Sequence, residues 1–206
     1  MFTGIVQGLG TIAAWGPGAD TRRLVVATDL PVERLPLGAS IAVDGVCLTV
    51  VERGPGRFSA DVGPETLART TFAGRREGEL VHLEPPLAAG EPLGGHIVAG
   101  HVDGVGVVAA ARPRGDALEL DIDAPPELAR YLVPKGSITV DGVSLTINTA
   151  VERRFGVTLI PHTLAVTHLG RLAPGAAVNL EADLIAKHVD RLVAHYVRVP
   201  VPGATS

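Results

Sequence analysis

The sequence contains one cysteine, Cys47, and few aromatic residues, and these shortages exclude several classes of protein. A single cysteine allows neither an internal disulfide nor a multi-cysteine zinc motif. Aromatic residues make up 3% of the 206 residues, which argues against stacking platforms for single-stranded nucleic acid. Lys and Arg total 18 against 22 Asp and Glu, so the chain also lacks the basic surplus of proteins that bind a phosphate backbone.

Long apolar runs are missing as well. No stretch approaches the ~20 apolar residues of a membrane span, and the start, MFTGIVQGLG, lacks the basic and apolar regions of a signal peptide. Hydrophobic residues nevertheless make up 46% of the chain, enough for a packed core. We therefore expect a soluble, cytoplasmic protein that binds neither membranes nor nucleic acid.

What the sequence does have is a tandem repeat. Residues 40–53, SIAVDGVCLTVVER, resemble residues 137–150, SITVDGVSLTINTA, and 19 of the 45 positions from 40 to 84 are identical to their counterparts 97 positions later. The match extends backwards with a slip of one residue. Because a Pro- and Gly-rich stretch separates the copies, we predict one domain over residues 1–92 and another over 93–183, followed by an unrepeated tail, 184–206.

Each copy consists of short β-branched segments separated by Gly, Pro and Asp. About six strands per copy predict an all-β fold, a small Greek-key barrel or sandwich, with brief helical turns at PVERL, PETLART and PPELARYL. In the tail, the spacing of Ile185, Val189, Leu192 and Tyr196 predicts an amphipathic helix. Such a helix either caps its own barrel or packs against partner copies. His188 and His195 on it are expected to face solvent.

Four motifs in this order, MFTGIVQG, the paired S-I-x-V-D-G-V-[CS]-L-T, the paired P-x-T-L-A-x-T and GGHIVAGHVDG, resemble the riboflavin synthase family of the α-chain type. The resemblance covers nearly the whole chain. It implies two similar six-stranded Greek-key β-barrels and a C-terminal helix, assembled as a homotrimer. It also implies a transferase that binds 6,7-dimethyl-8-ribityllumazine in each barrel. Two such molecules would be dismutated by four-carbon transfer to riboflavin and 5-amino-6-(D-ribitylamino)uracil, the last step of riboflavin biosynthesis, without cofactor or metal.

A reaction between two identical molecules explains why a domain would be duplicated. Two similar pockets brought face to face hold both reactants in register, and in the best cases such proximity supplies ~7–11 kcal/mol of the barrier. Because one molecule donates carbons and the other accepts them, the pockets should share binding residues and differ in reactive ones. The shared polar residues are Ser40 and Ser137, Thr49 and Thr146, and Thr66 and Thr163, with Gly4 and Gly100 permitting close backbone approach.

The polar residues that the two copies do not share are the expected reactive ones. Cys47 stands opposite Ser144, and the remaining differences are Lys135 opposite Gly38, His101 opposite Ile5, Asp183 opposite Pro86, His162 opposite Glu65 and Asp61 opposite Thr158. From the resemblance we expect Cys47, His101, Lys135, Ser144 and Asp183 to be catalytic. His101, or a relay through Ser144, is the expected base at the acidic C7 methyl group of lumazine. Cys47, water or a ribityl hydroxyl is the expected nucleophile, and Asp183 and Lys135 would stabilise developing charge.

The resemblance implies substrate contacts along the matching segments of both copies. In the first copy and the N-terminal residues before its first strand, these contacts are Phe2, Thr3, Gly4, Ile5, Val6, Ser40, Cys47, Leu48, Thr49, Asp61, Val62, Gly63, Pro64, Glu65 and Thr66. Phe2 and Thr3 are expected to belong to the first copy's site. In the second copy they are His96, Gly100, His101, Val102, Lys135, Ser144, Leu145, Thr146, Thr158, Leu159, Ile160, Pro161, His162 and Thr163. Ala99, Gly63 and His162 depart from residues common in the family, which affects pocket shape rather than the reactive groups.

Other interpretations account for parts of the pattern. A lone cysteine on a strand is most often a buried small hydrophobe, and strand Ser and Thr are usually structural. The Asp44-Gly45 and Asp141-Gly142 pairs predict turns rather than ligand contacts. His96 and His101 alone do not make a metal site, and Gly8-Leu9-Gly10 is followed by no βαβ unit, so a dinucleotide site is not expected. The rival functions are a non-catalytic lumazine- or flavin-binding protein and a purely structural tandem barrel.

Overall fold

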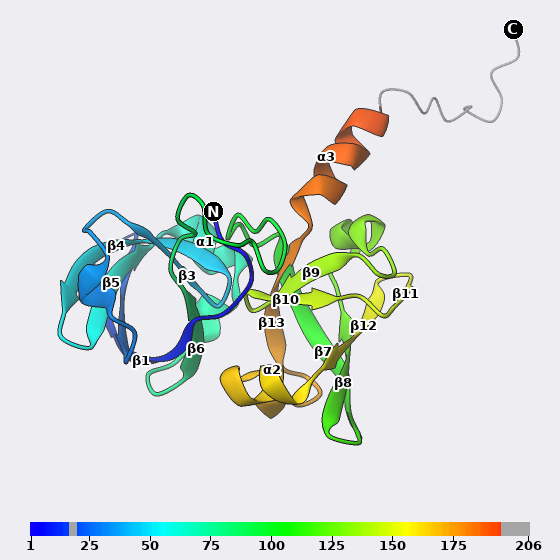
Figure 1. Ribbon diagram of the computed structural model, residues 1–206, viewed down its shortest axis with the longest axis horizontal. Helices are drawn as coiled ribbons and strands as arrows, with labels where there is room; N and C mark the ends of the chain where they lie inside the picture. The colour runs from blue at the N-terminus through cyan, green and yellow to red at the C-terminus, as the bar shows by residue number, and fades with distance from the viewer. Residues whose placement is uncertain (17–19, 195–206) are drawn as a thin grey trace, which may run out of the picture.

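The computed structural model describes residues 1–16 and 20–194, and it contains two antiparallel β-barrels (Figure 1). The first is closed, in the strand order β1-β2-β5-β4-β3-β6. Its short helical segments η1 (Val32–Arg34), α1 (Pro64–Arg69) and η2 (Thr71–Gly74) lie between strands. The strands are β1 (Gly8–Gly16), β2 (Arg22–Thr28), β3 (Ser40–Val43), β4 (Val46–Gly54), β5 (Arg57–Val62) and β6 (Leu80–Glu84).

The second barrel repeats this layout with one strand divided. Its order is β10-β9-β13-β7-β8-β12-β11, where β10 (Val143–Thr146) and β11 (Thr149–Val151) together occupy the place of β4. The first piece pairs with β9 and the second with β12. The other elements are β7 (Gly104–Arg114), β8 (Ala117–Asp123), η3 (Pro126–Tyr131), β9 (Ser137–Val140), β12 (Arg154–Leu159), α2 (Pro161–Val166), η4 (Leu169–Arg171) and β13 (Ala177–Ala182).

Each barrel has its own apolar core, as the alternating strands predict. Phe58 and Phe155, which are counterparts in the repeat, are both fully buried, one in each core. Residues of β4 alternate between buried and more exposed, so that one face fills the barrel and the other lies on its outside. A fully buried Leu, Ile or Phe contributes about 1.5–3 kcal/mol relative to an exposed one. The predicted all-β class and barrel pair are therefore confirmed.

The two barrels meet at their Asp-Gly turns. Asp44 and Asp141 both have a φ of 45°, and the glycines that follow them also have positive φ, so the predicted turns are present. A Cβ on Gly45 would lie 2.7 Å from the backbone nitrogen of Gly142, and one on Gly142 would lie 2.6 Å from that of Gly45. Only glycine allows this approach. The repeat therefore places equivalent turns against each other, around a local pseudo-twofold axis.

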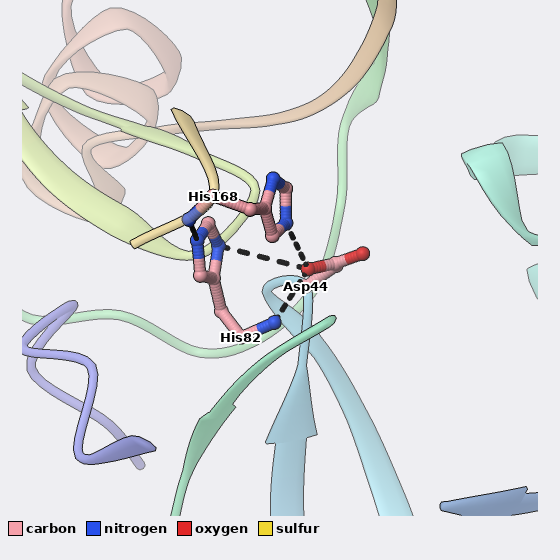
Figure 2. Close-up of side chains that lie close together, drawn as sticks. All are labelled: Asp44, His82 and His168. Atoms are coloured by element: carbon pink, nitrogen blue, oxygen red, sulfur yellow. Dashed lines mark hydrogen bonds and ion pairs between the residues drawn. The ribbon is translucent and has the colours of Figure 1, made fainter. Parts of the chain in front are cut away.

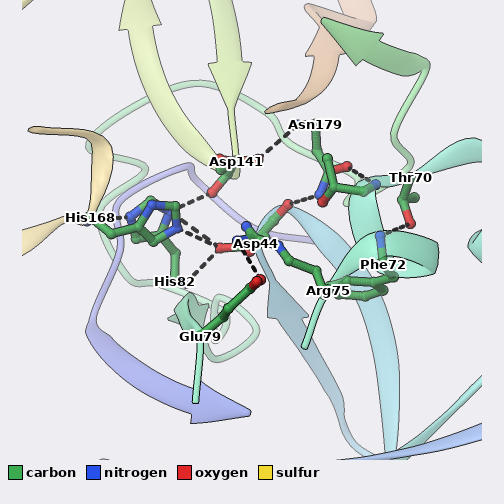
Figure 3. Close-up of polar contacts among 10 residues, drawn as sticks. Asp44, Thr70, Phe72, Arg75, Glu79, His82, Asp141, His168 and Asn179 are labelled. Atoms are coloured by element: carbon green, nitrogen blue, oxygen red, sulfur yellow. Dashed lines mark hydrogen bonds and ion pairs between the residues drawn. The ribbon is translucent and has the colours of Figure 1, made fainter. Parts of the chain in front are cut away.

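Two side chains that differ in type make equivalent hydrogen bonds around this axis (Figure 3). His82 Nδ1 lies 2.8 Å from the carbonyl oxygen of Asp141, and its Nε2 accepts from the backbone N–H of His168 at 2.9 Å. At the counterpart of His82, Asn179 Nδ2 donates to the carbonyl oxygen of Asp44 and Oδ1 accepts from the backbone N–H of Thr71. Because Nε2 is an acceptor, His82 is the neutral Nδ1–H tautomer, and burial lowers its pKa to about 4.

The last described element, α3 (Leu184–Val193), projects away from both barrels (Figure 1). Asp183 caps its N-terminus by accepting a hydrogen bond from the backbone N–H of Ile185. The predicted apolar stripe is exposed, with Ile185 at 58%, Val189 at 51% and Leu192 at 63% of their accessible surface. The helix therefore does not cap its own barrel. His188 is exposed as expected, whereas His195 and Tyr196 lie outside the described residues. No described helix is long and apolar enough to cross a membrane.

Candidate functional site

The shared hydroxyls form a row on the outer face of the first barrel. Ser40 on β3 pairs with Thr49 on β4. Thr49 precedes the Val50–Ala60 pair, so the register places it beside Asp61 on β5. Asp61 is held by Arg23, whose Nε and Nη2 both donate to its carboxylate. The row offers two hydroxyls and one oriented carboxylate, which suits recognition of a polyhydroxylated chain.

Cys47 lies two residues before Thr49 on the same face and opens into a pocket of about 350 Å³. The half-buried side chain also contacts the small cluster formed by Phe2, Ala42 and Val98, so Phe2 lies close to Cys47. The pocket combines the start of β4 and the helix α1 with a segment that follows the linker. Its lining is Val46, Cys47, Glu65, Thr66, Arg69, Thr70, Gly100, His101, Val102 and Asp103.

Each reactive position is covered by a segment that precedes the opposite barrel. Gly100 belongs to the second copy, but its carbonyl accepts from the backbone N–H of Cys47 at 2.8 Å. In the equivalent contact, the carbonyl of Gly4 accepts from the N–H of Ser144 at 2.8 Å. Val102 accordingly packs against the first core and Val6 against the second. Thus Gly4 and Val6 face the second copy's site, a crossing that the tandem repeat did not predict.

Ser144 is paired with a buried histidine. Its Oγ lies 2.7 Å from Nδ1 of His96, which is 8% exposed. His96 Nε2 is buried and has no hydrogen-bond partner among the described residues. Burial lowers the pKa of His96, and the carboxylate of Asp183 opposes this shift. The imidazole is therefore neutral at pH 7, with its second nitrogen uncommitted. This arrangement can pass a proton to or from Ser144.

The second barrel carries its own row of hydroxyls. Ser137 pairs with Thr146, and Thr158 on β12 has its Oγ1 bonded to the side-chain amide of Asn148 at 2.8 Å. Asn148 lies where the strand equivalent to β4 is divided, so the division turns an amide toward the site. Thr158 stands where the first barrel has Asp61. The two rows therefore share their Ser and Thr members and differ in charge.

Two other predicted catalytic residues are exposed. His101 lines the Cys47 pocket, and its side chain makes no hydrogen bond within the described chain. Lys135 lies at a turn with φ 69°, a conformation uncommon for a residue other than glycine. Its counterpart Gly38 has φ 85°, so Lys135 occupies a position whose backbone conformation favours glycine. Lys135 takes part in no ion pair among the residues described here.

The remaining predicted contacts divide by exposure. Several have side chains buried in the barrel interior, because they occupy inward-facing strand positions, and only their backbone reaches the outer face. These are Leu48, Val62, Leu145 and Leu159. Gly63 and Thr163 are partly exposed, and Pro64, Ile160, Pro161 and His162 are exposed, all at the starts of α1 and α2. Thr3 and Ile5 line a second hollow of about 450 Å³ beneath the linker 85–94.

Asp44, His82 and His168 come close enough to resemble a metal site (Figure 2). Both ring nitrogens of His82 are already engaged, however, by Asp141 and His168. The two imidazoles stack with centroids 3.7 Å apart, and His168 Nε2 donates to Asp44 Oδ1 at 3.0 Å. Arg75 binds the other carboxylate oxygen of Asp44. The cluster is an ion-pair and hydrogen-bond network between the barrels, so the donors do not fit a metal.

Sequence reasoning did not single out the buried carboxylates that organise these contacts. Glu84 and Glu181 are the last residues matched in the repeat, and they are 6% and 1% exposed. Each accepts hydrogen bonds from two successive backbone N–H groups of a crossing segment. Their presence at matching ends of two apolar strands was a signal in the sequence for a structural role. A glutamate is almost never buried at such a position unless it has a partner.

Comparison with known proteins agrees with this geometry. The lumazine binding domain family matches residues 3–85 and again 99–183. Riboflavin synthase from Mycobacterium bovis is 47% identical over 197 residues, covering 94% of this chain and 98% of the relative. Riboflavin synthase from Bacillus subtilis is 40% identical over 193 residues, covering 94% and 90%.

Solved structures support the same assignment. A crystal structure of LumP with riboflavin superposes with a TM-score of 0.82 at 29% identity, covering 88% of this chain and 99% of LumP. LumP with 6,7-dimethyl-8-(1'-D-ribityl) lumazine gives a TM-score of 0.80 at 28% identity and the same coverage. With the lumazine binding domain matched twice and relatives 40% and 47% identical over nearly their whole length, the chain belongs to the riboflavin synthase family.

Proposed function

We propose that this protein dismutates two molecules of 6,7-dimethyl-8-ribityllumazine into riboflavin and 5-amino-6-(D-ribitylamino)uracil. The observation that carries the proposal is the pair of sites with common hydroxyl rows and different reactive residues, the Cys47 pocket in one and Ser144 with His96 in the other. One lumazine gains the four-carbon unit that the other loses. The two products therefore contain all the atoms of the two substrates, and the reaction needs no external oxidant or reductant.

The residues of this chain divide the chemistry as follows. His96, neutral and bonded to Ser144, takes the proton from the C7 methyl group of one lumazine. The Cys47 pocket holds the other lumazine, whose C7 is the electrophile, with the thiol, water or a ribityl hydroxyl as nucleophile. The hydroxyl rows bind the ribityl chains. His101, Lys135 and Asp183 stabilise charge around the reacting rings.

The test is to incubate the purified protein with 6,7-dimethyl-8-ribityllumazine alone and follow riboflavin by absorbance and chromatography. One riboflavin formed for every two lumazines consumed, without added metal or cofactor, is the expected result. Stoichiometric binding without product would instead favour a non-catalytic lumazine-binding protein, the function suggested by the LumP structures with bound ligands. Absence of both binding and turnover would leave a structural tandem barrel.

The proposal includes assembly as a homotrimer. The pocket that contains Cys47 is lined by no residue of the Ser144 site, so two bound lumazines would meet only if the first barrel of one chain faced the second barrel of another. The exposed stripe of α3 supplies an apolar surface for such an assembly.

We therefore expect Val189→Glu, which places a charge on this stripe, to convert the oligomer to a species of monomeric mass and to abolish turnover. Deletion of residues 184–206 should weaken assembly in the same way. Mass photometry or light scattering across protein concentrations measures the effect. Arg191→Glu, on the opposite side of α3, is the matched control and should retain the mass of the unmodified protein. Full oligomeric mass for Val189→Glu would contradict the role of the helix.

A further inference from the structure

Glu84 and Glu181 make the same unusual contact at the ends of equivalent strands. Glu181 Oε1 accepts from the backbone N–H of Ala99 at 2.8 Å, and Oε2 accepts from that of Gly100 at 2.9 Å. Glu84 makes the matching bonds to the N–H groups of Thr3 and Gly4, at 2.7 and 3.0 Å. A buried carboxylate that binds two successive peptide groups fixes the position and orientation of that backbone.

The segments held in this way reach the reactive residue of the other barrel. Gly100, held by Glu181 of the second barrel, accepts a hydrogen bond from the N–H of Cys47 in the first. Its φ is +77°, and a Cβ there would lie 2.7 Å from the Cβ of Cys47. Gly4, held by Glu84 of the first barrel, has the same relation to Ser144, with a Cβ distance of 2.6 Å. Each glutamate is therefore linked to the reactive residue of the opposite barrel by direct contacts through a single glycine.

We propose that Glu181 is the positioning residue for the Cys47 site and Glu84 for the Ser144 site, each acting across the barrel boundary through a glycine. Neither glutamate touches the reacting atoms. Each reactive site is therefore completed by a carboxylate from the other copy, which ties the two halves of the reaction to a single relative placement of the barrels. The inference deepens the proposed function by assigning positioning residues to both of its sites.

The two glutamates differ in one hydrogen-bond donor, which Glu84 has and Glu181 lacks. Thr3 Oγ1 donates a third hydrogen bond to Glu84 at 2.8 Å, whereas Ala99 has no hydroxyl to offer Glu181. The charged groups near Glu181 are Asp103 and Lys187, which pair with each other at 2.7 Å. The paired residue on β9 is the uncharged Thr139.

Burial raises the pKa of Glu181 to about 7, against the lowering effect of the Ala99 and Gly100 N–H groups and Lys187, and Asp103 adds to the rise. Burial also raises the pKa of Glu84, opposed by its three hydrogen bonds. A protonated carboxyl has one oxygen that donates rather than accepts, so it cannot hold both peptide groups. As the pH falls through about 7, the Ala99–Gly100 segment should therefore loosen over Cys47.

Cys47 provides a direct probe because it is the chain's only cysteine. Its alkylation by iodoacetamide can be measured without turnover, so the result does not depend on the proposed reaction. At pH 8, we expect Glu181→Gln to alkylate at least about threefold faster than the unmodified protein, since an amide cannot accept at both positions. Glu84→Gln, the matched variant on the other segment, should leave this rate within about twofold. Equal rates for Glu181→Gln and the unmodified protein, or equal acceleration in both variants, would overturn the proposal.

Ala99→Thr tests the same inference by adding a contact. It supplies the hydroxyl that Thr3 supplies in the other copy. The midpoint pH below which Cys47 is alkylated faster should therefore fall by about one unit, with each rate divided by that of a thiol control peptide at the same pH. Circular dichroism and thermal unfolding establish that each variant is folded. If the glutamine variants fail to fold, an unchanged midpoint in Ala99→Thr would by itself contradict the role of Glu181.

Discussion

Replacing Asp44 by Asn is expected to lower the free energy of unfolding by about 3–5 kcal/mol at pH 6, because it breaks a buried charge network. Asp44 is completely buried and accepts from the backbone N–H of His82, from His168 Nε2 and from Arg75. An amide at this position would leave His168 without its buried counterion and Arg75 with only the more exposed Glu79 as an ion-pair partner. Urea denaturation followed by circular dichroism measures the change.

The pH dependence of this effect follows from the direction of the pKa shift. Burial alone would raise the pKa of Asp44, but His168, Arg75 and His82 outweigh it and lower the pKa below its usual value. A carboxyl with a lowered pKa in the folded state contributes stability above its unfolded pKa of about 3.9 and loses it as the pH falls through the folded value. The deficit of Asp44→Asn should therefore persist at pH 5 and shrink only below about pH 4.

His168 adds a second dependence, with the opposite sign. Desolvation lowers its pKa, but the hydrogen bond and charge of Asp44 dominate, so the net shift is upward. A histidine with a raised pKa contributes stability that is complete below its unfolded pKa of about 6.5 and is lost as the pH rises through the folded value. The deficit of Asp44→Asn should consequently be smaller at pH 9 than at pH 6.

Asp141→Asn is the matched control, because Asp141 is the counterpart of Asp44 around the pseudo-twofold axis. Asp141 Oδ1 accepts from the N–H of Asn179, but Oδ2 is buried without a partner among the described residues. Burial raises the pKa of Asp141 to about 7, and the charge of Asp44 adds to the rise. Here the folded state holds a proton that the unfolded state has released, so stability falls as the pH rises from about 4 to about 7.

Asn does not ionise, and Asp141→Asn should therefore be about 1–2 kcal/mol more stable than the unmodified protein at pH 8, with no such gain at pH 4. The same chemical change at two equivalent positions is thus expected to change the free energy of unfolding in opposite directions. A loss of several kcal/mol in both variants at pH 8 would show that the network treats the two carboxyl groups alike, contrary to the contacts of Arg75 and His168.

The fold was predictable because the repeat is detectable in the residues themselves. Identical positions such as Phe58 and Phe155 fill corresponding cores, and the β-branched segments form the expected strands. The division of β10 from β11 was not predictable. It falls at Asn148, whose side-chain amide bonds Thr158, and nothing in the strand pattern of residues 143–151 marks that break.

The arrangement of the two copies relative to each other could not be predicted from the sequence either. The Asp-Gly pairs were expected to form turns, and they do, but a turn prediction cannot tell that both turns meet around one axis. That contact is what carries Gly4 to Ser144 and Gly100 to Cys47. The differences between the copies predicted which residues are reactive, whereas Glu84 and Glu181, which hold the crossing segments in place, were not among the predicted site residues.

The arrangement also changes the role expected of His96. From the sequence it was a substrate contact, and His101 or a relay through Ser144 was the expected base. The geometry favours the relay, since His96 Nδ1 lies 2.7 Å from Ser144 Oγ while His101 is exposed and has no side-chain partner in the described chain. We therefore expect His96→Gln to slow proton removal from the C7 methyl group by about 10²–10⁴-fold.

Proton removal can be separated from product formation by following deuterium exchange at the C7 methyl group of 6,7-dimethyl-8-ribityllumazine in D₂O by NMR. Ser144→Ala should match His96→Gln, and the double variant should be no slower than either, because the two residues act as one unit. His101→Gln, the matched control from the other pocket, should exchange within about tenfold of the unmodified protein. If His101→Gln lost exchange while His96→Gln kept it, the base would belong to the Cys47 pocket, and the Ser144–His96 pair would serve the later steps of ring formation.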